Sequence, residues 1–256
     1  MPNEIIVILA MQAAMLLAAF LQSVTGIGFG LIAVPILLIA LQGGSAVQVA
    51  IVLSLLVCIV MSTSLYKLAD RPVLRDLVYG SILGLPVGIW LFSAIDILTL
   101  KAVAGITTVL MALLVAVRSS LRPWHLLTTL GRPGYVGAGI LSGVMSAVLA
   151  MPGPAAVTHL AATGFDKDAT RATSLSLLVL SHAAALALQA GFVGISAETA
   201  MTCLWLAPAT IAGTFIGRSV AAYVPTRQFS WALVVILLVT GSSMLLAVTL
   251  GDQLPR

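Results

Sequence analysis

Charged side chains are nearly missing from this chain, and their scarcity decides which solvent it folds in. Residues 5–66 form a run of 62 positions without an Asp, Glu, Lys or Arg. Charged residues make up only 8% of the sequence, and the mean hydropathy is +1.17. A water-soluble protein needs many more polar side chains to cover its surface, so a soluble fold is excluded.

The charge-free runs have the lengths of membrane segments. A helix crosses a bilayer with about 20 mostly apolar residues, so residues 5–66 hold two or three passes. We therefore predict an all-α integral membrane protein with eight to ten membrane segments. The N-terminus lacks the positive region of a cleaved signal peptide, so the first span is expected to be retained. Further charge-free intervals are 77–95, 102–117, 133–165, 172–197, 199–217 and 228–251.

Cysteine is also scarce, which removes several classes of site. Cys58 and Cys203 are the only two, without CxxC spacing, and both are expected to be buried core residues. No His, Cys or carboxylate stands at metal-ligand spacing from His159 or His182, so no metal or cofactor is predicted. No HExxH motif, membrane-embedded Asp pair or Ser-His couple at a plausible depth is present, which argues against an enzyme. The twelve basic residues are dispersed, so a nucleic-acid partner is not expected.

Two clusters of helix-breaking residues interrupt long apolar blocks. The first runs from Thr25 to Gly30 and holds three alternating glycines, and the second is Met-Pro-Gly-Pro at 151–154. Neither cluster fits inside a regular helix. The helical piece after each is only about nine or ten residues, or roughly 15 Å, which is half a membrane. Each block is therefore predicted to be a hairpin of broken helices that returns to the side from which it came.

The basic residues favour this hairpin topology over one in which each block crosses the membrane once. With hairpins and an outside N-terminus, ten of the twelve basic residues lie on the cytoplasmic side, and only Lys101 and Arg256 lie outside. Single crossings would leave about seven inside and five outside. Cytoplasmic loops collect Lys and Arg, so the hairpins are preferred. The inside residues are Lys67, Arg71, Arg75, Arg118, Arg122, Arg132, Lys167, Arg171, Arg218 and Arg227.

The two halves share landmarks in the same order. Ser-Leu-Leu-Val occurs at 54–57 and 176–179, and GxxxG occurs at 84–88 and 213–217. We predict an internal duplication, with a first repeat at 1–121, a cytoplasmic linker at 122–133 and an inverted second repeat at 134–256. Inverted repeats with interrupted helices are typical of secondary transporters whose site lies at the bilayer midplane.

The breakers offer chemistry suited to an anion. A half-helix that begins inside the membrane presents unpaired N–H groups and a partial positive charge. Arg171 is a candidate counter-charge, although it could instead be a surface anchor paired with Asp166 or Asp168. Each Ser or Thr could instead bond to its own helix, and either histidine could be a core residue. The predicted substrate-binding residues are Gln22, Ser23, Thr25, Gly28, Gly30, Ser54, Gly153, Pro154, Thr158, His159, Arg171 and Ser174, with His159 and His182 as candidates for proton coupling.

These motifs resemble the two signatures of the TauE/SafE sulfite exporter family. The first is Gly-Ile-Gly-Phe-Gly-Leu-Ile-Ala-Val-Pro at 26–35, and the second runs from Pro152 to Leu175. The second breaker departs from the family, which usually has a run of glycines there, and its prolines lack N–H donors. The positions that match the family pattern are Gly28, Gly30, Pro35, Gly153, Ala172, Thr173 and Ser174.

The resemblance implies transport of sulfite, sulfonates such as sulfoacetate, or related small organic anions. We predict a secondary transporter that exports such an anion across the bacterial inner membrane by alternating access. An anion channel and a scaffold subunit of a membrane complex are the alternatives. The expected partners are the anion, the lipid bilayer, coupling protons or sodium, and a second copy in a homodimer.

Overall fold

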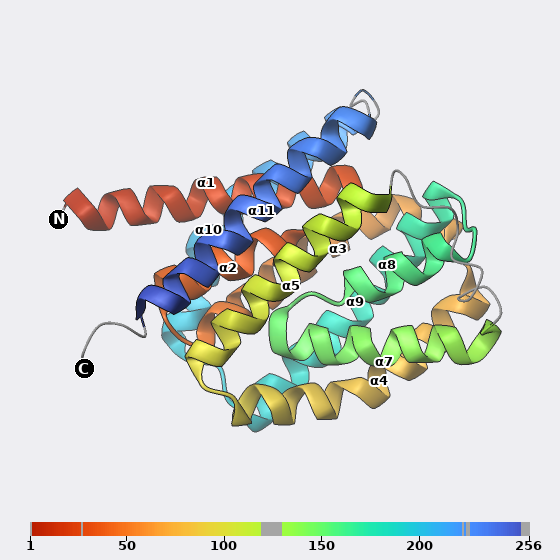
Figure 1. Cartoon of the computed structure of the whole chain (residues 1–256), viewed down its shortest axis with the longest axis horizontal. Coiled ribbons are helices and arrows are strands. Elements are labelled where there is room, and N and C mark those ends of the chain that lie inside the picture. The colour runs from red at the N-terminus through yellow and green to blue at the C-terminus, as the bar shows by residue number, and fades with distance from the viewer. Residues whose placement is uncertain (1, 27, 119–129, 222, 224–225, 252–256) are drawn as a thin grey trace.

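The computed structural model describes residues 2–26, 28–118, 130–221, 223 and 226–251, and the regular structure in these ranges is entirely helical (Figure 1). Six helices, α1, α3, α4, α5, α9 and α10, are long and apolar enough to cross a membrane. The chain is therefore a multi-pass membrane protein, and the count of eight to ten segments stays a prediction. The elements are α1 (Pro2–Thr25), α2 (Phe29–Leu41), α3 (Ser45–Leu65), the 3-10 helix η1 (Tyr66–Leu68), α4 (Arg71–Ala94), α5 (Ile97–Arg118), α7 (Gly131–Leu149), α8 (Gly153–Ala162), α9 (Lys167–Phe192), α10 (Ala197–Val220) and α11 (Thr226–Gly251).

Both predicted breakers end one helix and begin another. Between α1 and α2, Gly26 and Gly28 have φ angles of 83° and 118°, which a residue with a Cβ rarely adopts. Between α7 and α8 the turn depends instead on Ala150, whose φ is 54°. A left-handed non-glycine residue costs roughly 1–2 kcal/mol, so packing must hold Ala150 in place.

Close-packed glycines join each half of the chain to the other. A Cβ added at Gly84 would overlap the Ile140 carbonyl, so α4 lies directly on the backbone of α7. A Cβ added at Gly213 would overlap the Leu16 carbonyl in the same way, so α10 lies on α1. Small residues at such positions let helix backbones approach closely in a membrane.

The contacts along these pairs show that the chain reverses at each breaker. Gln12 donates to the Trp205 carbonyl at 2.7 Å and Gly217 meets Phe20, so α1 runs alongside α10 in the same direction. The chain then turns back, because α2 leads to Gly44 beside Phe92, at the end where α4 finishes and α10 begins. In Figure 1, α2 and α8 accordingly leave the middle of the molecule toward opposite ends.

The second half reverses in the same manner. Gly80 meets Val136 and Gly88 meets Val144, so α7 runs parallel to α4. The imidazole of His159, late in α8, lies against Gly134 at the start of α7. The α8 half-helix therefore returns to the end from which α7 began.

The outer surface of the bundle is apolar, as a lipid-facing surface must be. The side chains of Trp90, Leu204 and Trp205 are each about two-thirds exposed. Burying them in lipid rather than water is strongly favourable. Both cysteines are buried and free, as predicted.

The predicted repeat boundaries receive no direct test. Most of the predicted linker, residues 122–129, lies outside the described residues, as does the side chain of Arg122. The α7 helix begins at Gly131, three positions before the predicted start of the second repeat.

Candidate functional site

The two breakers meet in the middle of the fold. A Cβ at Gly30, in the first turn of α2, would overlap the carbonyl oxygen of Ala150 and would lie 2.9 Å from the Met151 Cγ. Only glycine permits this approach. The start of α2 and the turn before α8 therefore form one junction, which we call the breaker junction (Gly26–Gly30 and Ala150–Gly153).

Gln22 holds the first breaker in shape. Its Oε1 accepts a hydrogen bond from the Phe29 N–H at 3.0 Å, which caps the first turn of α2. Its Nε2 donates to the Cys58 Sγ of α3, also at 3.0 Å. Because the amide is engaged at both ends, Gln22 positions the half-helix, and its contact with substrate stays a prediction.

Arg171 reaches the first breaker from α9. One of its terminal nitrogens donates to the Ser23 carbonyl, and a Cβ at Gly26 would lie 2.7 Å from the Arg171 Cγ. The glycine is therefore what admits the arginine stem. Ser23 is the third residue from the end of α1, where carbonyls lack intrahelical partners, and a cation there also complements the helix dipole.

The sequence leaves open an alternative in which Arg171 pairs with Asp166 or Asp168, and no such ion pair is observed. Within the described residues Arg171 makes no ion pair within 4.0 Å. Asp166 instead caps α9, accepting from the N–H groups of Asp168 and Ala169 at 2.9 and 2.8 Å. Asp168 acts on Arg171 only through a Coulomb attraction beyond ion-pair distance, so no described carboxylate directly pairs with the guanidinium at the breaker.

Several buried polar atoms near this arginine lack a hydrogen-bond partner among the described residues. They are the Nε of Arg171 and the hydroxyls of Ser23 and Ser174, the last one turn along α9. An unsatisfied buried polar group costs about 1–3 kcal/mol. The Nε–H of the guanidinium and the two hydroxyls together form a group of donors that can hydrogen-bond to an oxyanion.

The remaining predicted residues differ in how they are used. Thr25 and Thr158 donate to carbonyls of their own helices, Leu21 and Pro154, each at 2.7 Å. Gly28 serves the turn conformation, and a Cβ there would meet no atom within 4 Å. Ser54 is buried on α3. Gly153 and Pro154 begin α8, where the missing N–H of proline leaves fewer donors than at α2.

The two histidines lie at different places. The His159 ring stacks edge-on against Tyr135 with ring centres 5.0 Å apart, near the start of α7 and one and a half turns beyond the start of α8. His182 is fully buried on α9, and its Nδ1 lies 3.4 Å from the Ser146 Oγ of α7. Both histidines therefore contact α7, His159 near its start and His182 near its end, and it is the end of α7 that leads into the second breaker.

Comparison with known protein families decides the identity of the chain. The model of the sulfite exporter TauE/SafE family matches residues 11–244. This chain belongs to the TauE/SafE family. Members of the family are transporters rather than enzymes, in agreement with the absence of catalytic motifs. Neither the curated proteins nor the solved structures contain a match to the chain.

Some residues of this TauE/SafE protein that shape the junction escaped prediction. Ala150 carries no sequence signal, because its left-handed conformation follows from packing. Ser142, Ser146 and Gln189 were missed although a signal existed, since each is a polar residue inside an apolar run.

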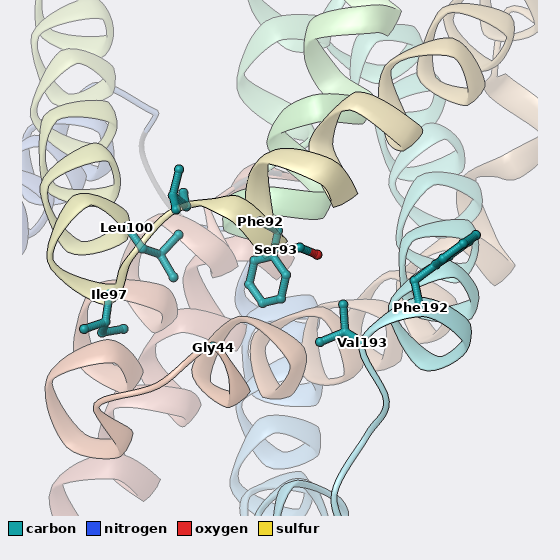
Figure 2. A pocket seen from close by; sticks show the side chains of 8 residues that line it. Gly44, Phe92, Ser93, Ile97, Leu100, Phe192 and Val193 are labelled. Carbon is teal, nitrogen blue, oxygen red and sulfur yellow. The ribbon is translucent and has the colours of Figure 1, made fainter.

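A cavity of about 380 Å³ lies at another place in this TauE/SafE protein (Figure 2). It sits where α4 ends, α5 begins and α9 ends, and Phe92 and Val193 point into it. None of the described residues that line it carries a charge, so these residues offer an anion no counter-charge. The lining residues are Gly44, Phe92, Ser93, Ile95, Ile97, Leu100, Phe192 and Val193.

The described part of the chain also holds no group of three His, Cys, Asp or Glu residues that could bind a metal ion. The features that suit a charged ligand are therefore those of the breaker junction and Arg171.

Proposed function

We propose that this TauE/SafE protein is a secondary transporter that exports a small sulfur oxyanion or organosulfonate across the bacterial inner membrane by alternating access. The observation that carries the proposal is Arg171, a guanidinium half-buried beside the first breaker with no carboxylate within 4.0 Å among the described residues. A charge placed inside an apolar bundle is costly unless a ligand or partner compensates it.

The substrate class follows from the donors around this charge. The guanidinium is planar and suits the oxygens of sulfite or a sulfonate, which accept from two N–H groups at once. The N-terminus of α2 adds the positive end of its dipole, and the Ser23 and Ser174 hydroxyls add neutral donors. We propose that the anion lies between Arg171 and the start of α2, with Gly30 at its edge.

The two halves of the chain make equivalent glycine-to-backbone contacts, and these contacts support alternating access. The α4–α7 and α10–α1 pairs are both built on glycines that meet a partner's backbone. The α2 and α8 half-helices leave the breaker junction in opposite directions (Figure 1). We propose that the halves form an inverted repeat with the N-terminus outside, and that they rock about the junction to open the site to one side at a time.

The test is an anion pulse on purified protein in liposomes, read as current on a solid-supported membrane. Sulfite, sulfoacetate, isethionate, thiosulfate and lactate form the panel. A saturable current for one of them, with isotope counterflow, supports a carrier. A conductance far above carrier turnover would indicate the channel, and the absence of both current and counterflow would indicate the scaffold.

Substitution of the arginine makes the test specific. Arg171→Ala removes charge-assisted hydrogen bonds worth about 1.5–3 kcal/mol, so the half-saturating anion concentration should rise about 10- to 100-fold. Arg171→Lys keeps the charge and should recover part of the affinity. Arg75→Ala is the matched control, because the Arg75 side chain is 58% exposed at the surface end of α4. Equal affinity in Arg171→Ala and Arg75→Ala would refute the assignment.

A further inference from the structure

A second group of buried polar side chains lies between α7 and α9. Ser142 and Ser146 contribute from α7, and His182 and Gln189 contribute from α9, all with no measurable exposure. We call these four residues the α7–α9 polar cluster. The Ser142 hydroxyl, the His182 Nε2 and the Gln189 Oε1 have no hydrogen-bond partner among the described residues. Ser142 lies one turn before Ser146 on α7, and three unsatisfied buried atoms are a large cost for a structural role alone.

A hydrogen bond joins the cluster to the end of α7, just before the second breaker. Arg171 makes the equivalent hydrogen bond to the end of α1, just before the first breaker. Gln189 Nε2 donates to the Ala147 carbonyl at 2.8 Å, and Ala147 is the third residue from the end of α7. Ser23, the acceptor of Arg171, is likewise the third residue from the end of α1. Helix α9 therefore hydrogen-bonds to the last turns of both α1 and α7. A movement of α9 would displace both of these helix ends.

The cluster differs from the first breaker in charge. His182 is its one titratable group, and it lies eleven positions after Arg171 on α9, which is roughly 16 Å along the helix. The cluster offers no fixed cation, so it does not duplicate the anion site. The imidazole is the one side chain of the cluster that can bind and release a proton.

The titratable groups on the neighbouring helices are engaged elsewhere. On α4, Asp76 pairs with Arg132 of α7 at 3.2 Å and lies 3.6 Å from Arg75. This group is five residues before Ser81, which pairs with Ser181 at the level of His182. On α3, Cys58 accepts from Gln22.

The groups nearer the start of α9 are also occupied. Tyr135 of α7 and His159 of α8 contact each other. The Asp70 carboxylate accepts from the Val73 N–H at 3.0 Å, and its own N–H donates to Thr173, nine residues before His182. Lys67 in η1 is exposed. Among the described residues His182 makes no ion pair.

We propose that His182 is the proton-binding site of the transport cycle, with Ser146 holding the imidazole through Nδ1 and Nε2 exchanging the proton. This inference rests on the proposed transport function. One proton taken up at Nε2 from one side is released from Nε2 to the other, and no bond other than N–H is made or broken. Because α9 also carries Arg171, the rearrangement that moves the anion site also moves the imidazole.

The test separates proton movement from anion exchange. Liposomes containing the protein and the pH-sensitive dye pyranine receive a gradient of isethionate, while potassium and valinomycin clamp the membrane potential. Isethionate stays fully ionised near neutral pH, so any dye signal reports protons carried by the protein. Isotope counterflow of isethionate is measured on the same liposomes, because exchange needs no net proton movement.

Wild-type protein should give both the dye signal and counterflow. His182→Gln keeps a polar, uncharged side chain and should lose at least nine-tenths of the dye signal while keeping counterflow within about twofold. Ser146→Ala should keep counterflow and shift the pH at which the dye signal is half-maximal. Thr210→Val is the control and should match wild type in both readouts, because Thr210 is a buried polar residue of α10 that donates to the Leu206 carbonyl of its own helix.

Other outcomes would overturn the inference. If wild-type protein gives counterflow without a dye signal, transport is not coupled to protons, and the proposed transport function still stands. A normal dye signal in His182→Gln assigns the proton to another group. Loss of counterflow in both His182→Gln and Ser146→Ala makes the cluster structural. Absence of counterflow in the wild type defeats the proposed sulfonate transport itself.

Discussion

Gly30 lies directly against the carbonyl oxygen of Ala150, so two breakers from opposite halves of the chain form one junction. The contact is closely constrained on both sides. Position 30 must be glycine, and Ala150 has a left-handed φ of 54°. Backbone atoms cannot move aside as a flexible side chain can. The junction should therefore respond sharply to small changes.

Gly30→Ala should lower both stability and transport. The added Cβ overlaps backbone, and overpacking of this kind costs about 1–3 kcal/mol. The thermal midpoint of the purified protein should fall, and anion counterflow should be lost. Gly137→Ala is the control, because a Cβ there meets nothing within 4 Å and alanine favours a helix. Equal midpoints for the two variants would contradict the close contact.

Replacement of Gln22 tests the cap of the half-helix. Gln22→Leu keeps the volume and removes both hydrogen bonds, leaving the Phe29 N–H buried without an acceptor. We expect a loss of about 1–3 kcal/mol in the free energy of unfolding. Gln12→Leu removes a single, exposed hydrogen bond to Trp205 and should cost less. The comparison is made by thermal unfolding in one detergent, and a larger loss in Gln12→Leu would count against the capping role.

Asp96 gives a pH-dependent effect outside the membrane segments. Hydrogen bonds from the Thr99 side chain and backbone, with one from the Leu98 N–H, lower the pKa of Asp96 below its ordinary value of 3.8. A lowered folded-state pKa adds stability that is complete above the unfolded pKa and disappears as pH falls through the folded one. Asp96→Asn should therefore have a lower thermal midpoint than wild type at pH 7, and the two should converge as pH falls below about 3.8. A constant difference down to pH 3 would show that the carboxylate charge does not stabilise this cap.

The orientation of the chain can be tested with introduced cysteines. Ala197 and Leu68 are both exposed and lie at opposite ends of the bundle, and the native cysteines are buried. With the proposed topology, Ala197→Cys reacts with an impermeant thiol reagent added to intact cells, whereas Leu68→Cys reacts only after the membrane is opened. The reverse pattern would invert the topology, and labelling of both from outside would reject the hairpins.

The breakers could be predicted because glycine and proline act locally. The glycines at 26 and 28 allow the turn after α1, and the prolines at 152 and 154 suit the start of α8, where their missing N–H groups break no helical hydrogen bond. The helical spans were predictable for a similar reason, since a long charge-free run in lipid must satisfy its own backbone N–H and C=O groups, which it does by forming a helix. The buried state of Cys58 and Cys203 followed from their places in those runs.

The roles of individual polar residues could not be predicted with the same success. Gln22 looks like a substrate ligand in the sequence and serves as a helix cap in the structure. His159 and His182 look alike in the sequence, yet one contacts Tyr135 and the other Ser146. Arg171 stands beside two carboxylates in the chain and pairs with neither in the fold. Proximity along a helix says nothing about which face a neighbouring helix covers.

The sequence by itself determined that this protein lives in a membrane, is helical, and breaks its helices at two places, because these properties depend on hydropathy and local backbone limits. Only the tertiary structure decided that the two breakers touch, that Arg171 and Gln189 hold equivalent carbonyls of the two broken helices, and that His182 faces α7. Those relationships join residues far apart in the chain. They depend on how the glycine-lined helices pack together, and no local pattern of residues specifies that packing.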